Sequence, residues 1–154
     1  MPTVLIAEDD LMIADMIEEV LVAHGYDVCG IARTVAEAVV IGLRHKPDLA
    51  VLDLRLADGG LGTDIAAQLG AVGRLGILYA TGNMAEVILT AADGHACLAK
   101  PYSAADLLDA LKIVADLVDT GTAVPPIPRG LQILHPACGV DQKPLYGRQR
   151  LQSS

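Results

Sequence analysis

Five short apolar runs recur along the first 118 residues, and a stretch with helical spacing follows each of them. The runs predict strands at residues 3–7, 26–31, 49–52, 75–80 and 95–99. Strands that alternate with helices form a parallel sheet, because the helix carries the chain back to the edge where the previous strand began. We therefore expect an α/β fold, a doubly wound five-stranded parallel sheet with helices on both faces.

Side chains that can cap a helix mark where four of the five expected helices begin. They are Asp10, Thr34, Asn83 and Ser103. The last three stand three residues before an acid, which is the spacing of a capping box. The third helix has the weakest signal, because three glycines in residues 58–62 precede it, and we place it at residues 63–69.

The helical pattern stops after residue 118, which predicts one domain at residues 1–118 and a C-terminal extension at residues 119–154. Five prolines in this extension forbid a long helix. Its apolar side chains, among them Leu131 and Leu134, would be poorly hydrated if they were free, so it either lies on the body or crosses to another subunit. It is too short for a DNA-reading effector domain.

The overall charge argues against several classes of partner. The formal net charge is −8, and residues 1–118 hold 17 acidic against 7 basic side chains. Such a body repels nucleic acid. No run reaches the roughly 18 apolar residues of a membrane span, and no signal peptide begins the chain, so we expect a cytoplasmic protein without a membrane partner.

Acidic side chains follow two of the predicted strands, where each strand ends. Glu8 and Asp9 follow the first run, and Asp53 follows the third. The carboxyl ends of parallel strands open at one edge of the sheet, so the three acids are expected to share a pocket. Like charges this close are costly unless a cation offsets them, and carboxylates suit Mg²⁺. A magnesium site of this kind favours phosphate chemistry.

Two further strand ends supply a hydroxyl and an ammonium group. Thr81 follows the fourth run, and Lys100 follows the fifth. A phosphorylated Asp53 would need both, because the hydroxyl can hydrogen-bond one phosphoryl oxygen and the ammonium can neutralise another. Asp53 is then the nucleophile.

With these residues in order, residues 1–118 resemble the receiver domain of bacterial two-component response regulators, in the CheY-like superfamily. The shared pattern has an acidic pair after the first strand (Glu8-Asp9), an Asp after the third (Asp53), a Thr after the fourth (Thr81) and a Lys-Pro after the fifth (Lys100-Pro101). The resemblance implies the flavodoxin-like (βα)₅ receiver fold. It also implies a single receiver domain, since residues 119–154 offer no effector domain.

The resemblance further implies a role for each site residue. Asp53 accepts the phosphoryl group as an aspartyl phosphate, and Thr81 and Lys100 contact that group. Asp9, Asp53 and the main-chain carbonyl of Arg55 bind Mg²⁺ directly, and Glu8 acts through water. A sensor histidine kinase donates the phosphoryl group. The protein is then a phosphoacceptor that takes part in its own phosphorylation and dephosphorylation, rather than an enzyme, and we expect it to signal through protein contacts, as a homodimer held by the C-terminal extension.

One position departs from the family pattern. Receiver domains usually carry Tyr or Phe three residues before the Lys, and this chain has Cys97 there. Tyr79 and Tyr102 are candidate replacements for this switching ring, although packing at the sheet edge is the favoured role for both. The Tyr-Ala-Thr-Gly run that begins at Tyr79 is also similar to the Phe-Ala-Thr-Gly motif of an alphaproteobacterial receiver subgroup.

Three alternatives to the signalling switch stay open. The chain could serve as a phosphate sink or phosphorelay intermediate, or as a pseudo-receiver that only docks other proteins. A phosphohydrolase of the haloacid dehalogenase type also uses Asp, Mg²⁺, Thr and Lys on a parallel sheet. That class needs a second acid two residues after the nucleophile, where this chain has Arg55.

Overall fold

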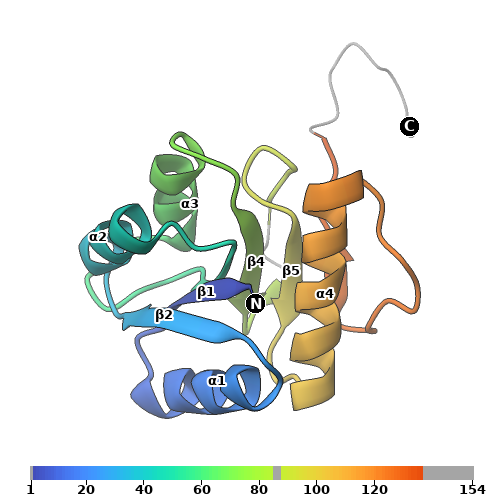
Figure 1. Cartoon of the computed structure of the whole chain (residues 1–154), viewed down its shortest axis with the longest axis horizontal. Coiled ribbons are helices and arrows are strands. Elements are labelled where there is room, and N and C mark those ends of the chain that lie inside the picture. Colours follow the sequence, from blue (N-terminus) through green and yellow to red (C-terminus); the bar gives the residue numbers. More distant parts are fainter. Residues whose placement is uncertain (1, 85–87, 137–154) are drawn as a thin grey trace.

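A computed structural model describes residues 2–84 and 88–136 and shows one six-stranded sheet (Figure 1). Its strands lie in the order β2-β1-β3-β4-β5-β6. They are β1 (Thr3–Ala7), β2 (Asp27–Ala32), β3 (Leu49–Asp53), β4 (Gly76–Thr81), β5 (Ala96–Ala99) and β6 (Leu131–Ile133). The first five strands are parallel, as predicted, and β6 pairs with β5 in the antiparallel direction. The expected number of five strands is corrected to six.

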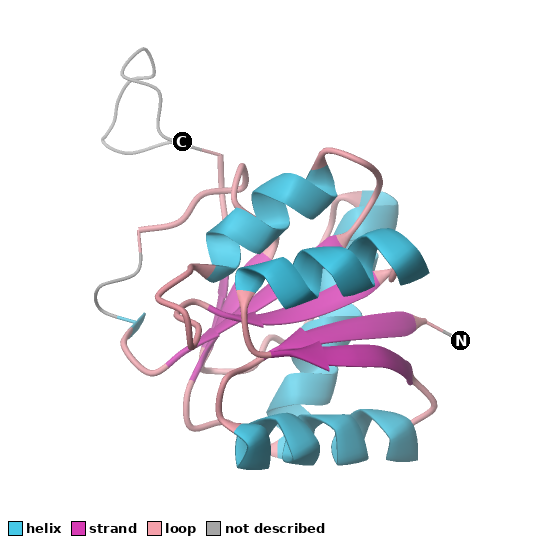
Figure 2. Ribbon diagram, turned by 90° about the vertical axis from the view of Figure 1, so that its left-hand side faces the viewer, coloured by secondary structure: helices cyan, strands magenta, loops and turns pink. Residues whose placement is uncertain are grey.

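Helices cover both faces of the sheet and enclose two separate cores (Figure 2). The helices are α1 (Leu11–Ala23), α2 (Val35–His45), α3 (Gly62–Gly70) and α4 (Ala104–Thr120). Helices α1 and α4 pack on one face, and α2 and α3 on the other. Alternate residues of β1 enter the two cores, Val4 and Ile6 on the first face and Leu5 and Ala7 on the second. This explains why the strand is apolar at every position.

The capping side chains hold three helix starts where they were predicted. The Asp10 carboxylate accepts hydrogen bonds from the amides of Met12 at 3.0 Å and Ile13 at 3.4 Å. Thr34 accepts from the amide of Glu37 at 3.2 Å, and Ser103 and Asp106 form the reciprocal pair of a capping box. These bonds satisfy amides that have no partner within the helix.

The helix predicted from Asn83 is not found in the described residues between β4 and β5. Residues 85–87 of that prediction lie outside them, and residues 88–95 form an irregular connection with a turn. The Asp93 carboxylate accepts from the amide of Thr90 at 2.9 Å, and the Thr90 hydroxyl accepts from the amide of Ala92 at 3.2 Å. These local bonds compete with the helical ladder, which explains why no helix continues through residues 88–95.

The C-terminal extension returns to the body. Helix α4 continues two residues past the predicted boundary at 118 and ends at Thr120, and the next residue, Gly121, caps it with a φ of 77° that suits a residue without Cβ. Residues 122–130 are irregular before β6. Leu131 and Leu134 are buried, so the described part of the extension lies on the body. No helix among the described residues is long and apolar enough to cross a membrane.

Candidate functional site

Four neighbouring strands end at one edge of the sheet, and each of them delivers a predicted site residue there. Glu8 and Asp9 follow β1, Asp53 ends β3, Thr81 ends β4 and Lys100 follows β5. The pairings β1–β3, β3–β4 and β4–β5 set these strand ends side by side. The fold therefore brings together the side chains that the sequence singled out, from stretches 92 residues apart at most.

The three acids form one compact cluster. Glu8, Asp9 and Asp53 each offer a carboxylate oxygen, and these oxygens lie within 4.8 Å of one another. Lys100 reaches into the cluster, with its Nζ 3.0 Å from Glu8 Oε1 and 3.4 Å from Asp53 Oδ2. One ammonium thus faces two carboxylates and offsets part of their repulsion.

Burial and charge shift the pKa values of Glu8 and Lys100. Glu8 is only 3% exposed, and loss of hydration raises its pKa, although the Asp10 amide and Lys100 act in the opposite direction. Burial alone would lower the pKa of Lys100, but the hydrogen bonds and charges of Glu8 and Asp53 outweigh it, so the pKa of Lys100 is raised. Lys100 therefore stays charged at neutral pH.

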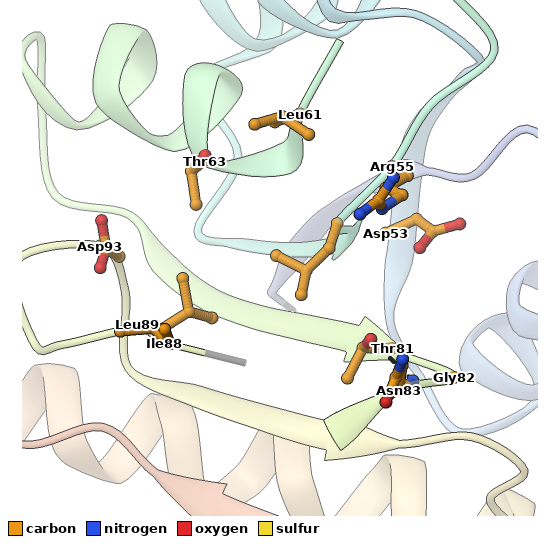
Figure 3. A pocket seen from close by; sticks show the side chains of 11 residues that line it. Asp53, Arg55, Leu61, Thr63, Thr81, Gly82, Asn83, Ile88, Leu89 and Asp93 are labelled. Atoms are coloured by element: carbon orange, nitrogen blue, oxygen red, sulfur yellow. Dashed lines mark hydrogen bonds between the residues drawn. The ribbon is translucent and has the colours of Figure 1, made fainter. Parts of the chain in front are cut away.

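A cleft of about 560 Å³ opens beside Asp53 and Thr81 (Figure 3). Leu61 and Thr63 line it from the start of α3, and Leu89 and Asp93 line it from the connection between β4 and β5. The Thr81 hydroxyl oxygen accepts a hydrogen bond from the Asn83 amide at 3.1 Å, which leaves its hydrogen free to be donated to a group bound in the cleft.

The donor set of the acidic cluster fits a hard divalent cation such as Mg²⁺. Glu8 is held by the Lys100 ammonium and by the Asp10 amide at 3.1 Å. Asp9 and Asp53 are partly exposed, so their oxygens are the more accessible ones for a metal. Arg55 lies two residues beyond Asp53, forms an isolated antiparallel β-bridge with Leu61 and lines the cleft. Its main-chain carbonyl, the third metal ligand that was predicted, is therefore close to the acidic cluster.

Cys97 and Tyr79 are both fully buried, and neither lies at the surface as a mobile ring would. The Tyr79 hydroxyl donates a hydrogen bond to the Asp93 carbonyl at 2.6 Å, and burial raises its pKa. Tyr79 is thus fixed in the core, in agreement with the packing role that was favoured for it. The Tyr102 hydroxyl is buried with no hydrogen-bond partner among the described residues.

Gly62 is a site residue that sequence reasoning missed. A Cβ at this position would collide with the main-chain oxygen of Asp53, so the first turn of α3 can approach the end of β3 only with glycine there. Its amide donates to the Leu54 carbonyl at 3.0 Å and fastens this approach. The glycines of residues 58–62 predicted only a loose turn, although a glycine just before a helix after an acidic strand end was an available signal.

The model of the response regulator receiver domain family matches residues 4–112, which span every strand end of the site. The chain belongs to the response regulator receiver domain family. Among curated relatives, this receiver domain is 33% identical over 113 residues to the transcriptional regulatory protein PdtaR of Mycobacterium tuberculosis, covering 71% of this chain and 55% of that protein. It is 30% identical over 111 residues to the chemotaxis protein CheY of Bacillus subtilis, covering 70% of this chain and 92% of that protein. The chain thus spans about half the length of PdtaR, the first of these relatives.

Solved structures show the same fold. The anti-anti-sigma factor PhyR of Bartonella quintana superposes on this chain with a TM-score of 0.64 at 30% identity. The superposition covers 78% of this chain and 49% of the PhyR chain. The signal receiver domain of a modulated diguanylate cyclase from Desulfovibrio desulfuricans superposes with a TM-score of 0.65 at 27% identity, over 79% of this chain and 99% of that one. The predicted receiver fold is confirmed.

Proposed function

We propose that this receiver domain accepts a phosphoryl group on Asp53 from the phosphohistidine of a sensor kinase and works as a switch in a two-component system. The surroundings of the Asp53 carboxylate carry the proposal. Lys100 Nζ lies 3.4 Å from the Asp53 carboxylate, and Thr81 lines the same cleft as Asp53 on the neighbouring strand. A nucleophile flanked by a fixed cation and a hydroxyl donor is suited to phosphoryl transfer.

In this transfer the protein mainly positions the reacting groups and stabilises charge, since Asp53 is its one residue that forms a covalent bond. An Asp53 oxygen attacks phosphorus in line with the scissile bond, an O–P bond forms and the N–P bond to the histidine breaks. Lys100 stays protonated and neutralises charge on the phosphoryl oxygens, and Thr81 donates its hydroxyl hydrogen to one of them. Bound Mg²⁺, with Asp9, Asp53 and the Arg55 carbonyl as its protein ligands and Glu8 acting through water, would supply further charge neutralisation.

The surface beside the site suits a protein phosphodonor. Met12 is 83% exposed and Met16 48% exposed on the outer side of α1. A cavity of about 330 Å³ lies beside Met16 and is lined by Ile13, Met16, Lys100, Pro101 and Tyr102. An exposed methionine at the rim of an apolar cavity, with a second one exposed on the same helix, offers adaptable contacts for a partner helix. A kinase docked there would present its phosphohistidine close to Lys100.

Output through protein contacts is part of the same proposal. PhyR of Bartonella quintana is an anti-anti-sigma factor, and its likeness to this chain favours an output that also controls another protein. A phosphate sink and a phosphorelay intermediate use the same chemistry and differ only in the next acceptor. The homodimer and the cytoplasmic location stay predictions; light scattering of the chain with and without residues 121–154 tests the role of the extension in a dimer.

The deciding experiment measures intact mass after incubation with Mg²⁺ and a small phosphodonor such as acetyl phosphate. We expect the mass to increase by one phosphoryl group in the native chain and not in Asp53→Asn. Asp58→Asn is the matched control, because Asp58 lies in the exposed loop after β3 and should leave phosphorylation intact. Absence of the adduct in the native chain would instead favour the pseudo-receiver, which only docks proteins.

A further inference from the structure

Residues 130–135, here called the strap, occupy the free edge of β5. The Ala99 amide donates to the Gly130 carbonyl at 2.9 Å, and the Leu134 amide donates to the His95 carbonyl at 3.0 Å. The Ala91 amide donates to the His135 carbonyl at 2.8 Å, which ties the strap to the β4–β5 connection as well. Without the strap, β5 would be an exposed strand edge that could pair with another chain.

The strap anchors in both cores. Leu131 lies in the core between the sheet and helices α1 and α4. Leu134 lies in the opposite core, in one cluster with Tyr79, Cys97 and Leu89. No α-helix covers this part of the second face among the described residues, so the strap together with residues 88–94 takes the place of a covering helix. Removing it would expose Tyr79 and Cys97 to a partner.

The strap contacts residues that lie next to the phosphorylation site along the chain. Its hydrogen bond to Ala99 is one residue away from Lys100, whose own amide donates to the Thr81 carbonyl at 2.7 Å. Leu134 shares its cluster with Cys97, three residues before Lys100, and with Tyr79, two residues before Thr81. A phosphoryl group that draws Lys100 and Thr81 toward Asp53 therefore pulls on β5, with which the strap pairs, and on β4, whose Tyr79 lies in the cluster of Leu134.

The strap is weakly held compared with the other strands. It pairs on one side only, over three residues, and its linker at residues 122–129 has no regular structure. Such edges belong to the low-stability part of a fold and open locally. The prolines of this linker also prevent a released strap from joining α4 as a longer helix.

We propose that the β5 edge is an output surface for an extended peptide segment, that the strap occupies it in the unphosphorylated chain, and that phosphorylation of Asp53 favours release of the strap. The segment that fits has the strap's own pattern, with apolar side chains at its second and fifth positions to replace Leu131 and Leu134. This inference rests on the proposed phosphorylation and adds the surface through which it is read out. The partner pairs with β5 in the antiparallel direction, as β6 does.

A disulfide that locks the strap tests the coupling. Ala96 and Ile133 face each other across β5 and β6. Directly opposed residues in antiparallel strands lie within the Cα separation of a disulfide. In the double variant Ala96→Cys/Ile133→Cys, oxidation should weaken binding of beryllium trifluoride with Mg²⁺, a phosphoryl mimic, by about fivefold or more relative to the same protein after reduction. Equal affinities in the two forms would overturn the coupling.

Two further measurements do not depend on that variant. In the native chain, hydrogen exchange at residues 130–135 should speed up when beryllium trifluoride binds, and in Asp53→Asn it should not. Leu134→Ala should bind the mimic more tightly, whereas Ile127→Ala, in the same extension but outside the strap, should bind it like the native chain. If the native chain binds the mimic but exchange at residues 130–135 is unchanged, release of the strap is refuted. If the native chain does not bind the mimic at all, the proposed phosphorylation is refuted instead.

A peptide with the sequence of residues 129–136 probes the surface itself. It should bind the reduced double variant in the presence of the mimic and fail to bind the oxidised form, in which the edge is covered. Equal binding to both forms would show that the peptide attaches elsewhere and would overturn the assignment of the β5 edge.

Discussion

Removing the Lys100 charge isolates what this side chain does for the acidic cluster. Lys100 Nζ lies 3.0 Å from the carboxylate of Glu8, and Glu8 is only 3% exposed, whereas Asp53 is more open to water. Lys100→Met replaces the side chain by an uncharged one that is one atom shorter, and leaves Glu8 without its cation. A buried unpaired carboxylate is costly, so the variant is destabilised in the absence of Mg²⁺.

The unfolding free energy that Lys100→Met loses has an upper bound, because Glu8 can take up a proton instead of remaining charged. Protonating a carboxyl whose ordinary pKa is 4.5 costs about 3.4 kcal/mol at pH 7, from 1.36 kcal/mol for each pH unit. At pH 5 the same step costs only about 0.7 kcal/mol. We therefore expect Lys100→Met to lose about 2–3 kcal/mol of unfolding free energy at pH 7 and less than about 1 kcal/mol at pH 5.

Urea unfolding in EDTA at the two pH values measures the loss. Lys112→Met is the matched control, because Lys112 is exposed on α4, and its effect should be small and the same at both pH values. In a Glu8→Gln background the Lys100 substitution should cost little at either pH. A penalty for Lys100→Met that is the same at pH 5 and pH 7 would refute the assignment of this cost to Glu8.

Two other predictions concern the metal and the buried thiol. Mg²⁺ at ten times its Kd should stabilise the native chain by about 1.4 kcal/mol, seen as a higher Tm, and Asp9→Asn should lose most of this gain while Asp58→Asn keeps it. Equal gains in all three proteins would contradict the metal site. Burial raises the pKa of Cys97 to about 11 from an ordinary 9.0, so the folded state retains a proton that the unfolded state releases, and stability falls as pH rises from 9 to 11. The stability difference between the native chain and Cys97→Ala, from denaturant midpoints, should shrink over this range by at most about 2.7 kcal/mol, and a constant difference would show that the thiol is not shielded.

The strands of the receiver fold were predictable because burial on both faces of the sheet requires a continuous apolar run in the sequence. Residues 4–7 face two cores in alternation, so every position is apolar, and the run ends abruptly at Glu8. The five predicted strands lie within one residue of the observed ones at each end. The same reasoning located the site, since acids directly after buried parallel strands must meet at one edge.

The errors have a different physical origin. Strand β6 is three residues long and lies among prolines and glycine, so nothing local distinguishes it from loop. Leu131 and Leu134 became strand-edge anchors only because β5 offered a free edge with two cores beside it. The connection between β4 and β5 carried a helix-start pattern at Asn83, but the side-chain bonds of Thr90 and Asp93 stabilise a turn there. In both places tertiary or local polar contacts outweighed propensity.

The missing ring and the added strand are best explained together. Cys97 is a small side chain on the face of β5 that lacks a covering helix in the described residues, and a small residue there leaves volume to be filled. Leu134 packs in that same cluster, with Tyr79 fixed beside it by its hydrogen bond to Asp93. A ring at residue 97 would enlarge the side chain in this cluster, where Leu134 is buried as well. We therefore predict that Cys97→Phe disfavours the buried position of Leu134, which faster hydrogen exchange at residues 130–135 would show, and unchanged exchange would contradict this link.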